Sequence, residues 1–72
     1  MQAAILGIGY WGPNLVRNFL GNNKIEKVFT FDLNKDRLTM IKKRFPQVHI
    51  VENVDDIFHL NEIEIVVIAT PV

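Results

Sequence analysis

Three glycines near the amino terminus have the spacing of a turn that could hold a phosphate-bearing ligand. The stretch AAILGIGYWGPNLVRNF, residues 3–19, places Gly7, Gly9 and Gly12 in the pattern G-x-G-x-x-G. In such a turn Gly7 permits a sharp bend, Gly9 lets the backbone approach a pyrophosphate, and Gly12 lets a helix pack close to a strand. The N–H groups and the positive dipole end of that helix would then hold the anion.

An acidic residue follows at the distance that this chemistry requires. Asp32 lies 20 positions after Gly12, at the end of a β-branched and aromatic run over residues 28–31. A carboxylate there can accept hydrogen bonds from the ribose hydroxyls of an adenosine, and it would repel a 2′-phosphate. No arginine lies directly beside Asp32, although Arg37 is one turn into the next helix, so the residues favour NAD over NADP.

The apolar pattern predicts the elements that would position these residues. Strands are expected over residues 3–8, 28–31, 48–51 and 63–69, and helices over 13–20, 35–45 and 54–60. Pro13 suits the first turn of the first helix, and Gly21 is expected to end that helix in the left-handed conformation. Asn34 and Asn53 are predicted to cap the second and third helices.

The order β-α-β-α-β-α-β predicts an α/β fold with a parallel sheet. With right-handed crossovers we expect a four-stranded sheet of order 3-2-1-4, a partial Rossmann fold. The third helix would lie alone on one face and leave apolar side chains of the strands at 3–8 and 63–69 uncovered. We therefore expect a homo-oligomer, formed through this face or through the edge of the fourth strand.

Composition narrows the classes of partner. The chain has 72 residues, and its eight basic residues balance its eight acidic ones, which predicts neither a nucleic-acid partner nor an anionic membrane surface. Cysteine is absent, and His49 and His59 lack partners at metal-ligand spacing, so no metal is expected. The apolar runs are too short to span a bilayer, which predicts a cytoplasmic location.

The segments G-I-G-Y-W-G-P-N-L-V-R-N-F, F-D-L-N-K-D-R-L and V-V-I-A-T-P resemble the start of the Gfo/Idh/MocA oxidoreductases, the relatives of glucose–fructose oxidoreductase and inositol dehydrogenase. The similarity covers essentially the whole chain, and it implies that residues 1–72 are the amino-terminal portion of a dinucleotide-binding domain, with the substrate domain absent. It implies cofactor contacts at Gly7, Gly9, Tyr10, Trp11, Gly12, Asp32, Thr70 and Pro71. At Tyr10 and Trp11 only the backbone N–H groups would face the pyrophosphate, so the resemblance also accounts for two bulky rings inside a glycine turn.

The resemblance implies the NAD(H)-binding part of an oxidoreductase that acts on a sugar, cyclitol or related polyol by hydride transfer. The family's Glu-Lys-Pro motif is absent and no residue is a convincing acid–base catalyst, so we expect the chain alone to be inactive. We also expect weak NAD binding, because only the adenosine half of the site is present. Two alternatives stay open. One is a methyltransferase-type fragment that binds S-adenosylmethionine, although Gly12 and Pro13 argue against a ligand without pyrophosphate. The other is a non-enzymatic fragment that folds and self-associates.

Overall fold

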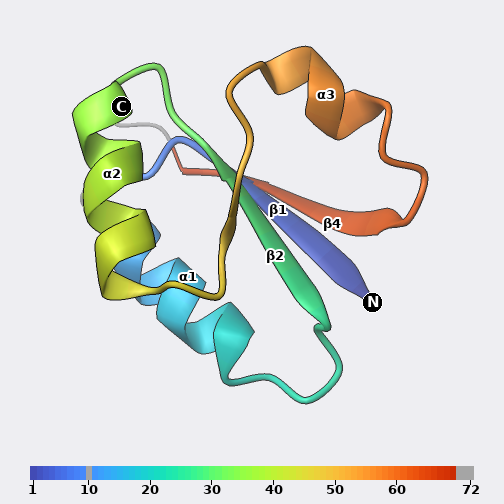
Figure 1. Cartoon of the computed structure of the whole chain (residues 1–72). Helices are drawn as coiled ribbons and strands as arrows, with labels where there is room; N and C mark the ends of the chain where they lie inside the picture. Colours follow the sequence, from blue (N-terminus) through green and yellow to red (C-terminus); the bar gives the residue numbers. More distant parts are fainter. Residues whose placement is uncertain (10, 70–72) are drawn as a thin grey trace.

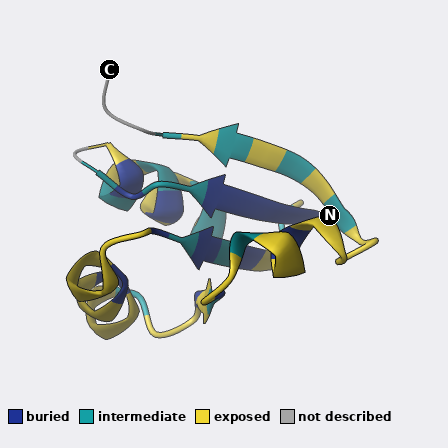
Figure 2. Cartoon of the chain, turned by 90° about the horizontal axis from the view of Figure 1, so that it is seen from above, coloured by how far each residue is buried: buried dark blue, intermediate teal, exposed yellow. Residues whose placement is uncertain are grey.

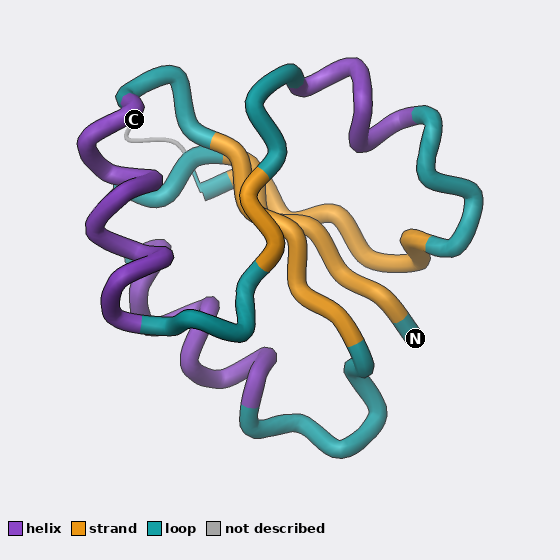
Figure 3. Tube along the Cα trace, viewed as in Figure 1, coloured by secondary structure: helices purple, strands orange, loops and turns teal. Residues whose placement is uncertain are grey.

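Strands and helices alternate along the chain in the computed structural model, which describes residues 1–9 and 11–69. The elements are β1 (Gln2–Leu6), α1 (Gly12–Leu20), β2 (Lys27–Phe31), α2 (Lys35–Arg44), β3 (His49–Ile50), α3 (Val54–Phe58) and β4 (Ile63–Ile68). The strands form one parallel sheet of order β3-β2-β1-β4 (Figures 1 and 3). The predicted α/β fold, the partial Rossmann arrangement and the strand order are confirmed.

Different helices cover the two faces of the sheet. Helices α1 and α2 pack on one face, where Ile5, Val16 and Val28 are almost completely buried at the centre of the larger hydrophobic cluster. Helix α3 packs on the other face, where Ile57 and Ala4 belong to a smaller cluster. Figure 1 shows α1 and α2 together on one side of the strands and α3 on the other. Right-handed crossovers require this division, because the strand order reverses between β3 and β4.

Strand β4 is only partly covered. Figure 2 shows β1 buried over most of its length, whereas β4 alternates between intermediate and exposed residues. Val66 and Ile68 pair in register with Ala4 and Leu6 of β1, so they face the side that carries α3, and they are 45% and 68% exposed. An uncovered apolar surface is therefore present on β4, whereas the expectation that β1 would share it is wrong, because β1 is buried. The homo-oligomer expected from it stays a prediction.

Two asparagines cap helices as the sequence predicted. The Asn34 side chain accepts hydrogen bonds from the backbone N–H groups of Asp36 and Arg37, at 2.9 and 3.4 Å, at the start of α2. The Asn53 side chain accepts one from the N–H of Asp55, at 3.0 Å, at the start of α3. Each asparagine thereby satisfies N–H groups that have no partner within the helix.

The expected left-handed conformation of Gly21 is wrong. Gly21 has φ −82° and ψ −3°, in the right-handed region that any residue adopts. Its N–H donates to the carbonyl of Arg17 at 3.1 Å, and the N–H of Asn22 donates to the carbonyl of Phe19 at 3.1 Å. The last turn of α1 thus continues in helical geometry through Gly21, and the backbone there does not require glycine.

Helix α2 is mostly exposed and buries only Leu38 and Ile41 among its 10 residues. The Nζ of Lys42, in the last turn of α2, donates to the carbonyls of Pro46 and Val48 in the segment that follows the helix, at 2.8 and 2.7 Å. No helix in the described part of the chain is long and apolar enough to cross a membrane.

Candidate cofactor site

The glycine turn joins β1 to α1 at the carboxyl ends of the strands. Gly7 and Gly9 have φ values of 84° and 47°, the only positive φ values among the described residues. Residues with a side chain rarely adopt a positive φ, whereas glycine adopts it without steric cost. The N–H of Gly7 donates to the carbonyl of Phe31 at 2.8 Å and extends the pairing of β1 with β2 by one residue. The backbone shape of the turn therefore requires glycine at both positions.

Gly12 marks a close approach of α1 to the end of β1. A Cβ atom at Gly12 would lie 2.7 Å from Cγ2 and 3.0 Å from Cβ of Ile8, a side chain that is 2% exposed. The N–H of Gly12 also donates to the carbonyl of Ile8. The start of α1 and Ile8, two positions after the end of β1, therefore pack at a distance that leaves no room for a side chain at Gly12.

The start of α1 has no carboxylate of its own. Trp11 is the N-cap residue and its side chain makes no capping hydrogen bond, Pro13 lies in the first turn, and no acidic residue is present there. The first turn of a helix carries partial positive charge, although here the N–H of Gly12 already donates to Ile8 and Pro13 has no N–H. The end of α1 that borders the glycine turn is therefore suited to an anion.

Asp32 lies beside this turn, immediately after β2, and is 8% exposed. Its Oδ2 accepts a hydrogen bond from the N–H of Ile8 at 2.7 Å, and its Oδ1 accepts one from the N–H of Asn34 at 2.8 Å. Arg37 places Nη1 3.9 Å from Oδ2. A carboxylate oxygen has two lone pairs, so each oxygen keeps capacity for one more donor such as a ribose hydroxyl.

A cavity of about 490 Å³ opens between the glycine turn, the end of β2 and the end of β4. It is lined by Leu6, Gly7, Phe31, Asp32, Leu33, Asn34, Arg37, Val54 and Ile68. Leu33 is 91% exposed and Ile68 is 68% exposed, so two apolar side chains of the lining are open to solvent. Such a cavity, apolar with a few polar groups at one end, is typical of sites for small organic ligands.

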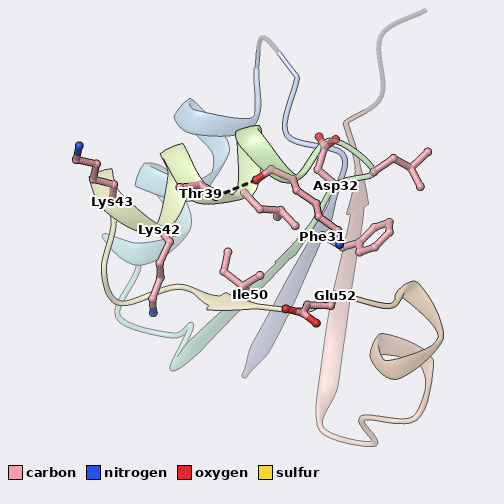
Figure 4. A pocket seen from close by; sticks show the side chains of 10 residues that line it. Phe31, Asp32, Thr39, Lys42, Lys43, Ile50 and Glu52 are labelled. Carbon is pink, nitrogen blue, oxygen red and sulfur yellow. Dashed lines mark hydrogen bonds between the residues drawn. The ribbon is translucent and has the colours of Figure 1, made fainter.

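A larger cavity of about 740 Å³ lies between α2 and β3 (Figure 4). It shares Phe31, Asp32 and Leu33 with the smaller cavity but includes no residue of the glycine turn. In Figure 4, Lys43 points away from the other labelled side chains. The smaller cavity is therefore the one that adjoins both the glycine turn and the Asp32 carboxylate.

The structure brings together the described residues that the sequence singled out. Gly7, Gly9, Trp11, Gly12 and Asp32 all lie at the carboxyl edge of the sheet, around the junction of β1 with α1 and the end of β2. The positions at 10, 70 and 71 (Tyr10, Thr70 and Pro71) are outside the described residues. The contacts that these eight residues would make with a cofactor stay predictions. Leu33 and Ile68 were not singled out, and only the fold brings them to one cavity.

The histidines do not form a metal site with other described residues. No group of three or more His, Cys, Asp or Glu residues in the described ranges could hold a metal ion. The ring of His49 instead lies against Phe29, with 5.2 Å between ring centroids.

Comparison with known proteins finds similarity to the redox-sensing transcriptional repressor Rex. The Rex proteins of Listeria welshimeri, Listeria monocytogenes and Listeria innocua are each 29% identical to this chain over 71 residues. The match covers 97% of this chain and 33% of each repressor, so the chain spans about a third of the length of the curated relatives it matches. No family model matches the chain. No solved structure matches it either.

These findings correct two predictions. The resemblance to the Gfo/Idh/MocA oxidoreductases is wrong, because the curated relatives are repressors of a different family, and the sugar or polyol substrate falls with it. The segments that carried it describe a glycine turn and strand ends, which belong to the fold rather than to one family. The exclusion of nucleic acid is also wrong, because the matched relatives are transcriptional repressors. A balanced charge over 72 residues does not describe the surface of a protein about three times as long.

Proposed function

We propose that this chain binds NAD(H) through the adenosine side of a Rossmann-type site, as part of a transcriptional regulator that senses redox state. One observation carries the proposal: the glycine turn and the Asp32 carboxylate meet at one edge of the sheet, beside a cavity of about 490 Å³. The redox-sensing function named for the relatives supports a cofactor that exists in an oxidised and a reduced form. NAD is such a cofactor.

The three parts of the site would hold three parts of the ligand. The pyrophosphate would lie at the start of α1, where Gly9 leaves the backbone accessible and the helix dipole is positive. The hydroxyl groups of a ribose would donate hydrogen bonds to the free lone pairs of the Asp32 carboxylate. The adenine would occupy the cavity lined by Leu33 and Ile68, and its contact would cover apolar side chains that are otherwise exposed.

The charges beside the ribose position favour NAD over NADP. Asp32 would face a 2′-phosphate with a negative charge, and a like charge at short range disfavours binding. Among the described residues, Arg37 forms an ion pair with that carboxylate, and its Nη1 lies 3.9 Å from Oδ2 of Asp32. The guanidinium therefore already has a partner in Asp32, which lowers its value for a phosphate.

The described residues would bind both redox states alike. NAD⁺ and NADH have the same adenosine and pyrophosphate and differ only in the nicotinamide. A ligand shifts an equilibrium only as far as its affinities for the two states differ. We therefore place the discrimination between NAD⁺ and NADH in parts of the protein outside the described residues. The described residues would retain the cofactor in either redox state.

Nucleic-acid binding would likewise belong to the remainder of the protein. A cytoplasmic location stays a prediction.

Calorimetric titration of the chain with NADH, NAD⁺, ADP-ribose and S-adenosylmethionine tests the proposal. We expect the first three ligands to bind with affinities within about threefold of one another, because they share the contacted groups. S-adenosylmethionine, which has no pyrophosphate, should bind much more weakly. Binding of S-adenosylmethionine without binding of NADH would favour the methyltransferase-type alternative. A folded chain that binds none of the four ligands would favour the non-enzymatic alternative.

Two variants localise the binding. Asp32→Ala removes the ribose acceptor and should weaken NADH binding by about tenfold or more, the typical effect of losing hydrogen bonds to a charged group. Asp36→Ala removes the same charge from an exposed position in the first turn of α2 and should leave the affinity within about twofold. Equal binding by wild type and Asp32→Ala would contradict the role given to Asp32.

A further inference from the structure

The residue between the two positive-φ glycines is fixed from both sides. The N–H of Ile8 donates to Oδ2 of Asp32 at 2.7 Å, and the carbonyl of Ile8 accepts from the N–H of Gly12. Gly7 and Gly9 on either side of it have the two positive φ values of the described chain. A chain with a glycine on each side of one residue can adopt many conformations, and these two hydrogen bonds favour one of them.

The bond to Asp32 is also well protected from water. Ile8 is 2% exposed and Asp32 is 8% exposed. A hydrogen bond with an ionised acceptor is stronger than a neutral one, and leaving a buried N–H without an acceptor is costly. The carboxylate is therefore a main determinant of the turn geometry, although it lies 24 positions away from Ile8 in the sequence.

We propose that Asp32 is a positioning residue for the phosphate-binding turn in addition to being a ribose ligand. The inference rests on the proposed function, because it concerns the pyrophosphate part of that site. Asp32 holds the Ile8 peptide, the Ile8 peptide holds the start of α1 through Gly12, and the backbone of the turn is thereby held in one shape before a ligand arrives. Pre-orientation raises affinity because the ligand does not have to order the loop on binding.

This role and simple electrostatics predict opposite effects on an anion that lacks a ribose. A carboxylate close to an anion site repels the anion, so its removal alone should strengthen the binding of inorganic pyrophosphate. Loss of the positioning bond should weaken it, because the turn would then sample other conformations. The sign of the change in pyrophosphate affinity therefore separates the two effects.

The first test is a titration of the chain and of Asp32→Ala with inorganic pyrophosphate, followed by the fluorescence of Trp11, the only tryptophan. We expect about tenfold weaker binding by Asp32→Ala, in line with the loss of a charge-assisted hydrogen bond. Asp36→Ala, which removes one negative charge but no bond to the turn, should bind pyrophosphate as tightly as wild type or slightly more tightly. Unchanged or tighter pyrophosphate binding by Asp32→Ala, with NADH binding lost, would leave Asp32 as a ribose ligand only and overturn the proposal.

The second test needs neither a ligand nor a variant. In the wild-type chain labelled with ¹⁵N and ¹³C, a scalar coupling across the hydrogen bond should connect the amide nitrogen of Ile8 with the carboxyl carbon of Asp32. The bond from the N–H of Gly7 to the carbonyl of Phe31, at 2.8 Å, provides the internal control. A Gly7–Phe31 coupling without an Ile8–Asp32 coupling would overturn the proposal, even if Asp32→Ala did not fold.

Amide hydrogen exchange in Asp32→Ala extends this test to the turn itself. We expect faster exchange at Ile8, by about tenfold or more relative to wild type, with little change at Gly7, whose acceptor is a backbone carbonyl. Equal acceleration at both amides would show a global loss of stability rather than a local one and would count against positioning. If wild type binds neither NADH nor pyrophosphate while the Ile8–Asp32 coupling is observed, the proposed function fails. The conclusion that Asp32 fixes the conformation of the turn would then stand.

Discussion

Replacing Gly12 by alanine should destabilise the fold, although the backbone at this position accepts a side chain. Gly12 is the first residue of α1, and alanine is favoured over glycine within a helix by up to about 1 kcal/mol. Against this gain, the new Cβ would lie 2.7 Å from Cγ2 of Ile8, closer than such atoms approach in folded proteins. Ile8 is 2% exposed and belongs to the larger hydrophobic cluster, so it has no free space to move into. Overpacking of this kind costs about 1–3 kcal/mol, so the net loss lies between about 0 and 3 kcal/mol, and the middle of the two ranges gives about 1.5 kcal/mol.

Urea unfolding followed by circular dichroism measures this change in the free energy of unfolding. Gly21→Ala is the matched control at the other end of α1: its φ is −82°, and its new Cβ would lie 3.5 Å from the carbonyl oxygen of Arg17, an ordinary contact. It should stabilise the fold by about 0.5 kcal/mol, mainly by restricting the unfolded chain. If Gly12→Ala were as stable as wild type, α1 would not pack against Ile8 at the distance reported above.

Substitutions at two further positions test a buried hydroxyl in the core and the cap of α2. Thr30→Val should raise the free energy of unfolding by about 1 kcal/mol in urea denaturation. Thr30 is fully buried, and its Oγ1 has no hydrogen-bond partner among the described residues. A loss of stability would reveal a partner for the hydroxyl. Asn34→Ala should lower it by about 1 kcal/mol by removing the cap of α2, whereas Asn34→Ser should retain most of the stability. Equal stability of these two variants would show that the cap contributes nothing.

The fold could be predicted because local patterns and one rule of chirality are enough to specify it. Apolar runs, two asparagine caps and the alternation of strands with helices give the elements. Right-handed crossovers then decide which face each helix covers, and the dinucleotide-binding pattern favours the strand order 3-2-1-4. The ends were less predictable. Strand β3 has two residues, His49 and Ile50, where four were expected, because its partner β2 pairs with it only through Phe29 and Thr30.

Gly21 shows where a local rule fails. Glycine after a helix is commonly left-handed, but this preference is statistical, and the carbonyls of the last turn can also be satisfied in right-handed geometry. Here the N–H of Gly21 bonds to Arg17 and the chain continues without changing hand. Nothing in the identity of the residue distinguishes these two outcomes.

The candidate site was predictable in part. The three glycines and Asp32 are recognisable because each meets a backbone or charge requirement at fixed spacing. The hydrogen bond from Ile8 to Asp32 was not, because it joins residues far apart in sequence whose contact depends on the register of β1 with β2. Leu33 and Ile68 carry no motif, and only the sheet brings them to the same cavity.

Family and partners were the least predictable, for a physical reason. The glycine turn and the strand ends reflect what a dinucleotide requires of a fold, and unrelated functions use the same fold. Nucleic-acid binding depends on charged surfaces that can lie anywhere in a longer protein, so the balanced charge of this chain carried no information about them.

Selective ¹⁵N-glycine labelling gives the most direct test of the central claim, that the glycine turn of this chain binds NAD(H). The chain has four glycines, so the spectrum contains one amide signal for each of Gly7, Gly9, Gly12 and Gly21. Titration with NADH should shift the signals of Gly7, Gly9 and Gly12, which surround the proposed pyrophosphate position, and leave that of Gly21 at the far end of α1 in place. Four unmoved signals at millimolar NADH, or a shift confined to Gly21, would contradict the account.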